Sequence, residues 1–379
     1  MELHHRLDTT TTQPSEVWVG AGVLDFDRDG DGPAAAVGEW LAGRRLFIVS
    51  SLPILDAQGR RLEPLRRRAA RSVVLDVPDG ETAKSPQHIV ELWDQLLAAG
   101  CKRDSRVVAF GGGSVGDLAG FAAATVLRGV EVAQVPTTLL AQVDAALGGK
   151  TGIDSEHGKN LIGAFHQPRF VLSDIDVLAT LPAGERRSGL VEAVKKAALL
   201  DVPLFERIES TLDPLLDGEA AALAPVIAGA ARAKLDVVER DAREGGLRKV
   251  LNYGHTLAHA IERQLSYRGL RHGEAVAYGI LFANRLAARH GVLSDAADPD
   301  GLNARMRTVL RRFELPPLPA ERLTLDGLTE AMAGDKKATE HGLVWVLPRR
   351  LGAFVFDTVP TALVRDELAS FLVDPWAGE

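Results

Sequence analysis

The feature that most constrains the fold is the alternation of two sequence patterns in the first half of the chain. Short apolar runs rich in Val, Ile and Phe, bounded by Gly, Pro or charged residues, predict strands. The stretch QHIVELWDQLLAA at Gln87–Ala99 is amphipathic and predicts a helix. Strands alternating with helices indicate a parallel sheet covered on both faces. The predicted strands are Leu46–Ser50, Ser72–Val77, Arg106–Phe110, Glu131–Val135 and Phe170–Ser173.

The pattern changes after about residue 179, where segments rich in Ala, Leu, Glu and Lys replace the apolar runs. A chain of 379 residues suits two domains of ordinary size. We predict an α/β plus α architecture, with an N-terminal Rossmann-like parallel-sheet domain over residues 1–178 and a C-terminal, mainly helical domain over residues 179–379. The predicted helices of the second domain are Ser188–Leu200, Glu219–Arg240, Val250–Gln264 and Gly273–Arg289.

Composition excludes several classes of protein. A net charge of -7 argues against a nucleic-acid binder, which would need a basic face for the phosphate backbone. Cys101 is the only cysteine, so an intrachain disulfide is excluded. The polar start MELHHRLDTTTTQP does not have the apolar region of a secretory signal, and no run of eighteen apolar residues suggests a membrane span. We therefore expect a cytoplasmic protein that binds neither nucleic acid nor membrane.

A glycine triplet marks a candidate nucleotide site. In RVVAFGGGSVGDLAGFAAA, an apolar strand leads through Gly111, Gly112 and Gly113 into a helix, where the backbone can approach a pyrophosphate closely. Asp117 would then contact a ribose or nicotinamide group. The spacing differs from GxGxxG, and the same pattern fits a tight turn without a ligand.

A charged pair precedes this motif in PDGETAK. Glu81 and Lys84 are three residues apart and share one helical face. They could hold the adenosine end of a dinucleotide, and the same spacing is common in a solvated surface pair.

The strongest chemical signal is LNYGHTLAHAIE followed by RHGEAVAYG. His255 and His259 are four residues apart and project from one helical face, and His272 follows at the start of another helix. Glu192, in the apolar helix SGLVEAVKKAALL, could supply a carboxylate, because a buried carboxylate needs a partner. Nitrogen and oxygen ligands suit zinc, with cobalt or iron(II) as alternatives.

Cations recur in apolar or glycine-rich surroundings near these motifs. Any one of them is typical of a protein surface, but together they suit a small substrate that carries both a phosphate and a carboxylate. They are Lys150, Lys159, Lys195, Lys234, Arg248, Lys336 and Lys337.

Seven motifs in order resemble those of the 3-dehydroquinate synthases, a family of sugar phosphate cyclases. The resemblance runs from about Val17 to the C-terminus. The motifs are GGGSVGDLAGFAAATVLRG, QVPTTLLAQVDAALGGKTGID, GKNLIGAFHQP, GLVEAVK, REGGLRKVLNYGHTLAHAIE, HGEAVAYG and DKK.

The resemblance implies a set of roles, together with a homodimer. The implied metal ligands are Glu192, His255 and His272. His259 would assist proton movement near the substrate phosphate. Lys150, Asn160 and Asn252 would bind that phosphate, and Arg128 would reach it across a dimer interface. Lys234 and Arg248 would bind the carboxylate, Asp144 and Lys195 would lie near the reacting hydroxyls, and Lys336 or Lys337 would close over the site. The implied NAD-binding residues are Glu81, Lys84, Gly112, Gly113, Asp117, Thr137, Thr138, Lys159 and Thr180.

The implied reaction converts 3-deoxy-D-arabino-heptulosonate 7-phosphate into 3-dehydroquinate and phosphate, in the shikimate pathway of aromatic amino-acid biosynthesis. NAD takes a hydride and returns it, so it is not consumed. A divalent metal polarises the alcohol that is oxidised. Phosphate elimination and an intramolecular aldol step complete the sequence.

Three departures from the family pattern stand out. Ala145 and Ala146 occupy positions where serines are usual, and Lys196 stands where a neutral residue is expected. Ser50 and Ser51 lie at the end of the predicted strand Leu46–Ser50, where an acidic residue or Thr-Asn often meets the adenine ribose. The first two departures leave room for a substrate variant, and the third concerns NAD affinity rather than NAD use.

Three alternatives follow. One is a related cyclase, either an aminodehydroquinate synthase or a cyclase acting on sedoheptulose 7-phosphate. The second is a metal-dependent alcohol dehydrogenase, which would release NADH and have little use for so many anion-binding residues. The third is a non-catalytic binding protein, against which the intact candidate metal ligands argue. A substrate without a carboxylate would leave the charges of Lys234 and Arg248 unpaired, which favours the keto-acid.

Overall fold

The computed structural model describes residues 1–7, 14–27, 32–294, 298, 300–333, 338–339 and 342–377. The chain forms two compact units, each made of two stretches of sequence. Unit 1 comprises Met1–Arg186 and Gly218–Arg243, and unit 2 comprises Arg187–Asp217 and Glu244–Glu379. This division differs from the expected boundary at 178/179, because the helix Ala220–Arg240 from the second half of the sequence belongs to unit 1.

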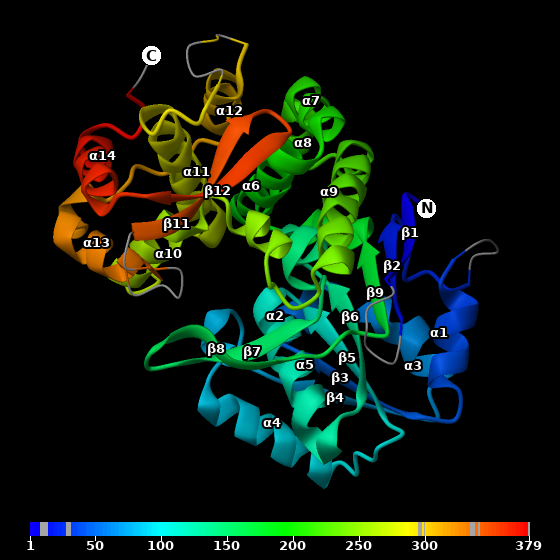
Figure 1. Ribbon diagram of the computed structural model, residues 1–379. Helices are drawn as coiled ribbons and strands as arrows, with labels where there is room; N and C mark the ends of the chain where they lie inside the picture. The colour runs from blue at the N-terminus through cyan, green and yellow to red at the C-terminus, as the bar shows by residue number, and fades with distance from the viewer. Residues whose placement is uncertain are drawn as a thin grey trace. The chain divides into compact units, whose positions relative to one another are not determined.

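Unit 1 is built around a seven-stranded sheet in the order β1-β2-β9-β6-β5-β3-β4, parallel except for the antiparallel pair β1–β2 (Figure 1). The five predicted strands are confirmed to within one residue at either end. The strand pairs β1–β2 and β7–β8 were not predicted. The strands are β1 Leu3–Leu7, β2 Ser15–Gly20, β3 Arg45–Ser50, β4 Arg71–Asp76, β5 Arg106–Gly111, β6 Glu131–Pro136, β7 Lys150–Ser155, β8 Gly158–Phe165 and β9 Phe170–Asp174.

Both faces of the sheet are buried, as a parallel sheet requires. Phe47 and Val49 pack in one cluster with Leu92 and Leu118, and the alternate residue Ile48 on the opposite face is also fully buried. The helices of unit 1 are α1 Ala34–Leu41, α2 Leu52–Gln58, α3 Glu63–Arg68, α4 Pro86–Ala98, α5 Gly113–Thr125 and α9 Ala220–Arg240, with short turns η1 Gly59–Leu62, η2 Glu81–Ala83, η3 Val126–Arg128, η4 Ala141–Ala145 and η5 Ile175–Thr180.

The helix α9 was predicted as a helix, and it belongs to unit 1 rather than to the helical half. It packs against β1, β2, η4 and η5. Its apolar side chains, such as Ile227 and Leu235, are fully buried. The amphipathic pattern therefore predicted the helix correctly but could not identify the surface that it covers.

Unit 2 is mainly helical, as predicted, and also contains a three-stranded antiparallel sheet in the order β10-β11-β12. Most of α11 is buried, and it contacts α10, α12, α14 and β11. The elements are α6 Ala183–Leu200, whose first turn belongs to unit 1, α7 Val202–Ser210, α8 Leu212–Asp217, η6 Leu247–Asn252, α10 His255–Gln264, α11 His272–Arg289, α12 Leu302–Arg311, η7 Ala320–Arg322, α13 Leu325–Ala333, β10 Ala338–Thr339, β11 Gly342–Arg350, β12 Ala353–Val359 and α14 Thr361–Val373. Within the described ranges, no helix has both the length and the hydropathy to cross a membrane.

Candidate metal centre and nucleotide-binding edge

The candidate NAD-binding residues of unit 1 follow the carboxyl ends of adjacent parallel strands. Gly112 and Gly113 follow β5, Thr137 and Thr138 follow β6, and Thr180 ends η5 just after β9. The β6 connection is tied to β5, because the Thr137 amide donates to the carbonyl of the last residue of β5 over 2.9 Å. Ligands of open α/β sheets bind at this edge, so the position fits a dinucleotide.

Lys84 is the centre of a charged cluster in unit 1. Its side chain is 3% exposed, and Nζ lies 2.8 Å from Oδ2 of Asp117 and 3.8 Å from Oδ1 of Asp154. Nζ also donates to Oδ1 of Asn160, whose backbone amide donates to Asp154 over 2.9 Å. The interpretation of Lys84 as part of a solvated surface pair is therefore wrong.

Glu81 extends this cluster towards solvent. Its carboxylate lies 3.6 Å from Nζ of Lys84 and 3.2 Å from Nζ of Lys159, and it accepts a 2.7 Å hydrogen bond from Ser114 Oγ. Burial raises the pKa of Glu81, but the charges of Lys84 and Lys159 outweigh burial and lower the pKa to about 2. The group is therefore a fixed negative charge at neutral pH.

For the pKa of Asp117, burial outweighs the charge of the neighbouring lysine. Burial raises its pKa above the ordinary aspartate value, although Lys84 opposes the shift. The pKa of Lys84 itself is raised, since the charges of Asp117 and Glu81 outweigh its burial. The candidate NAD residues Glu81, Lys84, Asp117 and Lys159 thus form one electrostatic unit, to which Asn160 and Asp154 also belong.

Four of the candidate substrate residues lie in unit 1, and two of their contacts are informative. Lys234, 6% exposed on α9, lies 3.1 Å from Oδ1 of Asp144 and donates to the Asp144 carbonyl over 2.7 Å. Asn160 lies beside Lys84. Arg128 is exposed in a left-handed turn with φ 67°, and Lys150 is exposed at the start of β7.

Two close backbone contacts of unit 2 bring together the helices that carry the candidate metal ligands. A Cβ on Gly279 of α11 would lie 1.8 Å from the carbonyl oxygen of Gly254, which precedes α10. A Cβ on Gly273, at the start of α11, would lie 2.0 Å from the carbonyl oxygen of Ser188 in α6. Any side chain at either position would push two helices apart.

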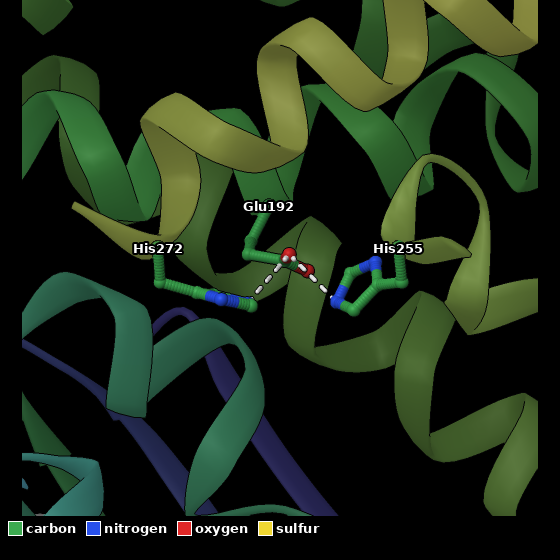
Figure 2. Close-up of side chains that lie close together, drawn as sticks. All are labelled: Glu192, His255 and His272. Carbon is green, nitrogen blue, oxygen red and sulfur yellow. Dashed lines mark ion pairs between the residues drawn. The ribbon is translucent and has the colours of Figure 1, made fainter. Parts of the chain in front are cut away.

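Glu192, His255 and His272 meet where these helices converge (Figure 2). Oε1 of Glu192 lies 3.5 Å from Nε2 of His255 and 3.8 Å from Nε2 of His272. One ligand atom from each residue lies within 4.8 Å of the others. Glu192 is fully buried and His255 is 8% exposed.

The second ring nitrogen of each histidine is held by an acceptor. Nδ1 of His272 lies 3.2 Å from Oε1 of Glu262, and Nδ1 of His255 lies 3.2 Å from the carbonyl oxygen of Tyr253. Each Nδ1–H therefore donates, which leaves Nε2 as the basic nitrogen that faces Glu192. Glu262 was missed by the sequence analysis, although it lies seven residues after His255 on the same helix.

The pKa values of the two histidines are shifted in opposite directions. Burial lowers the pKa of His255 well below its ordinary value, and the positive charge of Lys195 lowers it further. Burial also lowers the pKa of His272, but the hydrogen bond and charge of Glu262, together with the charge of Glu192, raise it overall. His255 is therefore neutral at pH 7 and ready to act as a ligand.

The arrangement fits a divalent metal such as zinc. Tetrahedral zinc with bonds of about 2.0–2.2 Å places neighbouring ligand atoms about 3.3–3.6 Å apart, close to the separations seen here. Two imidazoles and one carboxylate are a common catalytic ligand set, which leaves a coordination position for substrate.

Two lysines flank the carboxylate on its other oxygen. Nζ of Lys195 lies 2.5 Å from Oε2 of Glu192 and donates to the Leu251 carbonyl over 2.6 Å. Nζ of Lys196 lies 3.2 Å from the same Oε2. Lys195 was a predicted site residue, whereas Lys196 was noted only as a departure from the family pattern.

The remaining candidates of unit 2 lie on η6 and α10. Arg248 is 1% exposed. Asn252 donates to Oε1 of Glu244 over 2.9 Å. His259 is exposed, with its ring centroid 5.2 Å from that of His255 and 6.2 Å from that of His272. Lys336 and Lys337 lie outside the described residues.

Comparison with known proteins gives consistent results. The family models described as "3-dehydroquinate synthase N-terminal" and "3-dehydroquinate synthase C-terminal" match residues 74–188 and 189–338. The chain is 42% identical over 365 residues to a 3-dehydroquinate synthase of Nostoc sp. strain PCC 7120, covering 94% of this chain and 96% of that one. A 3-dehydroquinate synthase of Pelotomaculum thermopropionicum is 41% identical over 348 residues, covering 90% and 92%.

Solved structures of related cyclases share the fold. A 2-epi-5-epi-valiolone synthase from Streptomyces hygroscopicus, solved with NAD+ and Zn2+ bound, matches with a TM-score of 0.84 and 27% identity over 98% of this chain and 99% of that one. A 2-deoxy-scyllo-inosose synthase complexed with carbaglucose-6-phosphate, NAD+ and Co2+ matches with a TM-score of 0.84 and 25% identity, covering 96% and 98%. An iron-containing alcohol dehydrogenase, 15% identical with a TM-score of 0.64, shares only the fold.

Proposed function

Because this chain belongs to the 3-dehydroquinate synthase family, we propose that it converts 3-deoxy-D-arabino-heptulosonate 7-phosphate into 3-dehydroquinate and phosphate. It is a carbon–oxygen lyase that depends on NAD and a divalent metal, and it serves the shikimate pathway. The observation that carries the proposal is the convergence of Glu192, His255 and His272 in a chain that is 42% identical to such an enzyme.

When bound, the metal would polarise the secondary alcohol of the substrate, and NAD would supply the hydride acceptor that makes its transient oxidation possible. Glu192, His255 and His272 would hold the ion, with Glu262 and the Tyr253 carbonyl fixing the two imidazoles. Zinc and cobalt, the ions named in the two related cyclase structures, both suit this ligand set.

The unit 1 cluster would bind the dinucleotide. Lys84 and Lys159 both pair with Glu81, whose carboxylate accepts from Ser114 in the first turn of α5, where phosphates are favoured. Gly112, Asp117, Thr137, Thr138 and Thr180 would complete the binding residues. Asp79 accepts a 2.9 Å hydrogen bond from Ser51, so an acidic group is present near the end of β3 although the usual acidic residue is missing there.

The cationic residues would bind the two anionic ends of the substrate. We assign Lys234 and the buried Arg248 to the carboxylate, and Lys150, Asn160, Asn252 and Arg128 to the phosphate. Asp144 and Lys195 would orient the reacting hydroxyls, and His259 would move a proton near the phosphate. Lys336 or Lys337 would contribute a further cation. Of these candidates, Arg128, Asp144, Lys150, Asn160 and Lys234 lie in unit 1, and Lys195, Arg248, Asn252 and His259 lie in unit 2.

The decisive test measures phosphate release by the metal-loaded protein with 3-deoxy-D-arabino-heptulosonate 7-phosphate and catalytic NAD, while NADH absorbance is followed. We expect phosphate release without net NADH. His255→Ala should abolish both metal binding and phosphate release. The control is His290→Ala, since His290 pairs with Asp357 in unit 2 and has no role in the proposed mechanism.

Other outcomes would identify a different activity. Phosphate release only from sedoheptulose 7-phosphate or the amino analogue would assign the chain to a related cyclase. Steady accumulation of NADH would instead indicate a dehydrogenase. The identity of 41–42% to 3-dehydroquinate synthases, against 25–27% to the two other cyclases, favours the first outcome.

We further propose a cytoplasmic homodimer. The β7–β8 hairpin exposes Leu161 and Phe165, which are 48% and 49% exposed and lie on one face because they are four residues apart in a strand. A second copy of the chain could cover this apolar surface. Sedimentation velocity should show a dimer that Phe165→Asp converts to a monomer, while Val373→Asp, at an 87% exposed position, leaves it intact.

A further inference from the structure

The two oxygens of the Glu192 carboxylate face different partners. Oε1 faces the Nε2 atoms of His255 and His272, and Oε2 faces the ammonium groups of Lys195 and Lys196. One oxygen of this carboxylate therefore faces the two candidate metal-binding histidines, and the other oxygen faces the two lysines.

Lys196 is a buried residue of α6 whose ammonium group is in contact with Glu192. Its side chain is fully buried, and Nζ lies 3.2 Å from Oε2 of Glu192 and donates to the Glu192 carbonyl over 3.2 Å. The spacing of four residues along α6 places Lys196 directly one turn after Glu192. Burying an ammonium group costs free energy, so a lysine at this position is not a neutral choice for the helix.

Lys195 alone could neutralise and orient Glu192. It makes the shorter contact with Oε2 and is anchored at the Leu251 carbonyl. Lys196 places a second ammonium group on the same carboxylate oxygen. The second ammonium therefore adds positive charge beside a carboxylate that must also attract a divalent ion.

We propose that Lys196 is a positioning residue of the metal centre, which acts through Glu192 to weaken its hold on the divalent ion and so keeps the ion a stronger Lewis acid. An ammonium on Oε2 draws electron density away from Oε1, and its charge repels the cation. A less neutralised ion polarises a substrate oxygen more strongly. The inference rests on the proposed role of Glu192 as a metal ligand.

The test measures the dissociation constant for Zn2+ or Co2+ by competition with a chromophoric chelator. We expect Lys196→Met to bind the metal at least about tenfold more tightly than the wild type, because a unit charge near a divalent ion matters by this much even with water-like screening. Phosphate release at saturating metal should become slower. Lys196→Arg, which keeps the charge, should restore the wild-type affinity.

Controls separate this inference from the proposed function. Lys102→Met removes the same charge from an exposed position in unit 1 and should leave metal affinity unchanged. Glu192→Gln should greatly weaken metal binding. If the wild type itself binds no metal, the proposed function fails. If the wild type binds metal but Lys196→Met binds it equally or more weakly, only the role of Lys196 is overturned.

A folding defect has its own outcome. A second neutral variant, Lys196→Gln, serves as a check on folding. Thermal unfolding followed by circular dichroism would show whether Lys196→Met and Lys196→Gln fold with metal present. We expect both to fold, since Lys195 still pairs with Glu192. Failure of both variants to fold would make Lys196 a structural residue of the helix core and would overturn the assignment.

Discussion

At the scale of single residues, Glu262 decides how well His272 can serve as a ligand. Its carboxylate accepts from Nδ1 of His272 and is 5% exposed. Glu262→Gln keeps the shape of the acceptor but removes its charge, so the basicity of Nε2 should fall. We expect metal affinity to fall about 10- to 100-fold. Chelator competition would measure it, with the exposed Glu330→Gln as control. Unchanged affinity would rule out this supporting role.

Glu81 should make the free energy of unfolding of the protein depend on pH in the acidic range. A carboxyl with a folded pKa below its unfolded value adds stability above the unfolded pKa and loses it as the pH falls through the folded pKa. For Glu81 this window runs from 4.5 down to about 2. The side chain is 39% exposed, so solvent screening leaves only about 1 kcal/mol.

The comparison with Glu81→Gln isolates this contribution. At pH 7 the wild type should exceed the variant in free energy of unfolding by about 1 kcal/mol, and the difference should shrink towards zero as the pH falls through the window. Urea unfolding between pH 7 and pH 3, followed by circular dichroism, measures it. A difference that does not change with pH would show that Glu81 contributes through packing rather than charge.

At the scale of elements, the metal centre depends on how closely α10 and α11 approach. Gly279→Ala would place a methyl group 1.8 Å from the Gly254 carbonyl, so one helix must move. We expect a loss of about 2–3 kcal/mol in the free energy of unfolding, together with weaker metal binding, because His255 and His272 would separate. Urea unfolding and metal content per chain would test both effects.

The matched control for this substitution is Gly59→Ala. Gly59 has a helical φ of -57°, and an added Cβ would make only an ordinary 3.8 Å contact with Leu55. The same methyl group should therefore leave stability unchanged or slightly higher. If Gly279→Ala behaves like Gly59→Ala, the helix contact does not set the geometry of the metal centre.

At the scale of the whole molecule, the two cofactors would stabilise different units. The candidate metal ligands all lie in unit 2, and the candidate NAD residues all lie in unit 1. A ligand at 100 times its dissociation constant adds about 2.7 kcal/mol to the state that binds it. In hydrogen exchange followed by mass spectrometry, chelation should deprotect α6, α10 and α11, and NAD should protect peptides around β5 and α5. Protection of unit 1 alone by metal would contradict the assignment.

The sequence was sufficient for the features that depend on local chemistry. The five strands of the parallel sheet could be predicted because strands buried on both faces are short continuous apolar runs. His255 and His259 could be placed on one helix face by their spacing, and the ordered motifs identified the family. The edge strand β1 and the hairpin β7–β8 escaped prediction because they lack that continuous apolar pattern. The strand β2 is mostly buried, but its apolar run is limited to Val17–Val19.

Only the tertiary structure decided how separate segments combine. The sequence could not show that Glu262 supports His272, that Lys84 is buried among four acceptors, or that α9 belongs to unit 1. It also could not show that Lys196 faces the same carboxylate oxygen as Lys195. Local patterns report which face of an element is apolar. Which partner covers that face, and which oxygen a buried charge meets, depends on contacts between residues far apart in the chain.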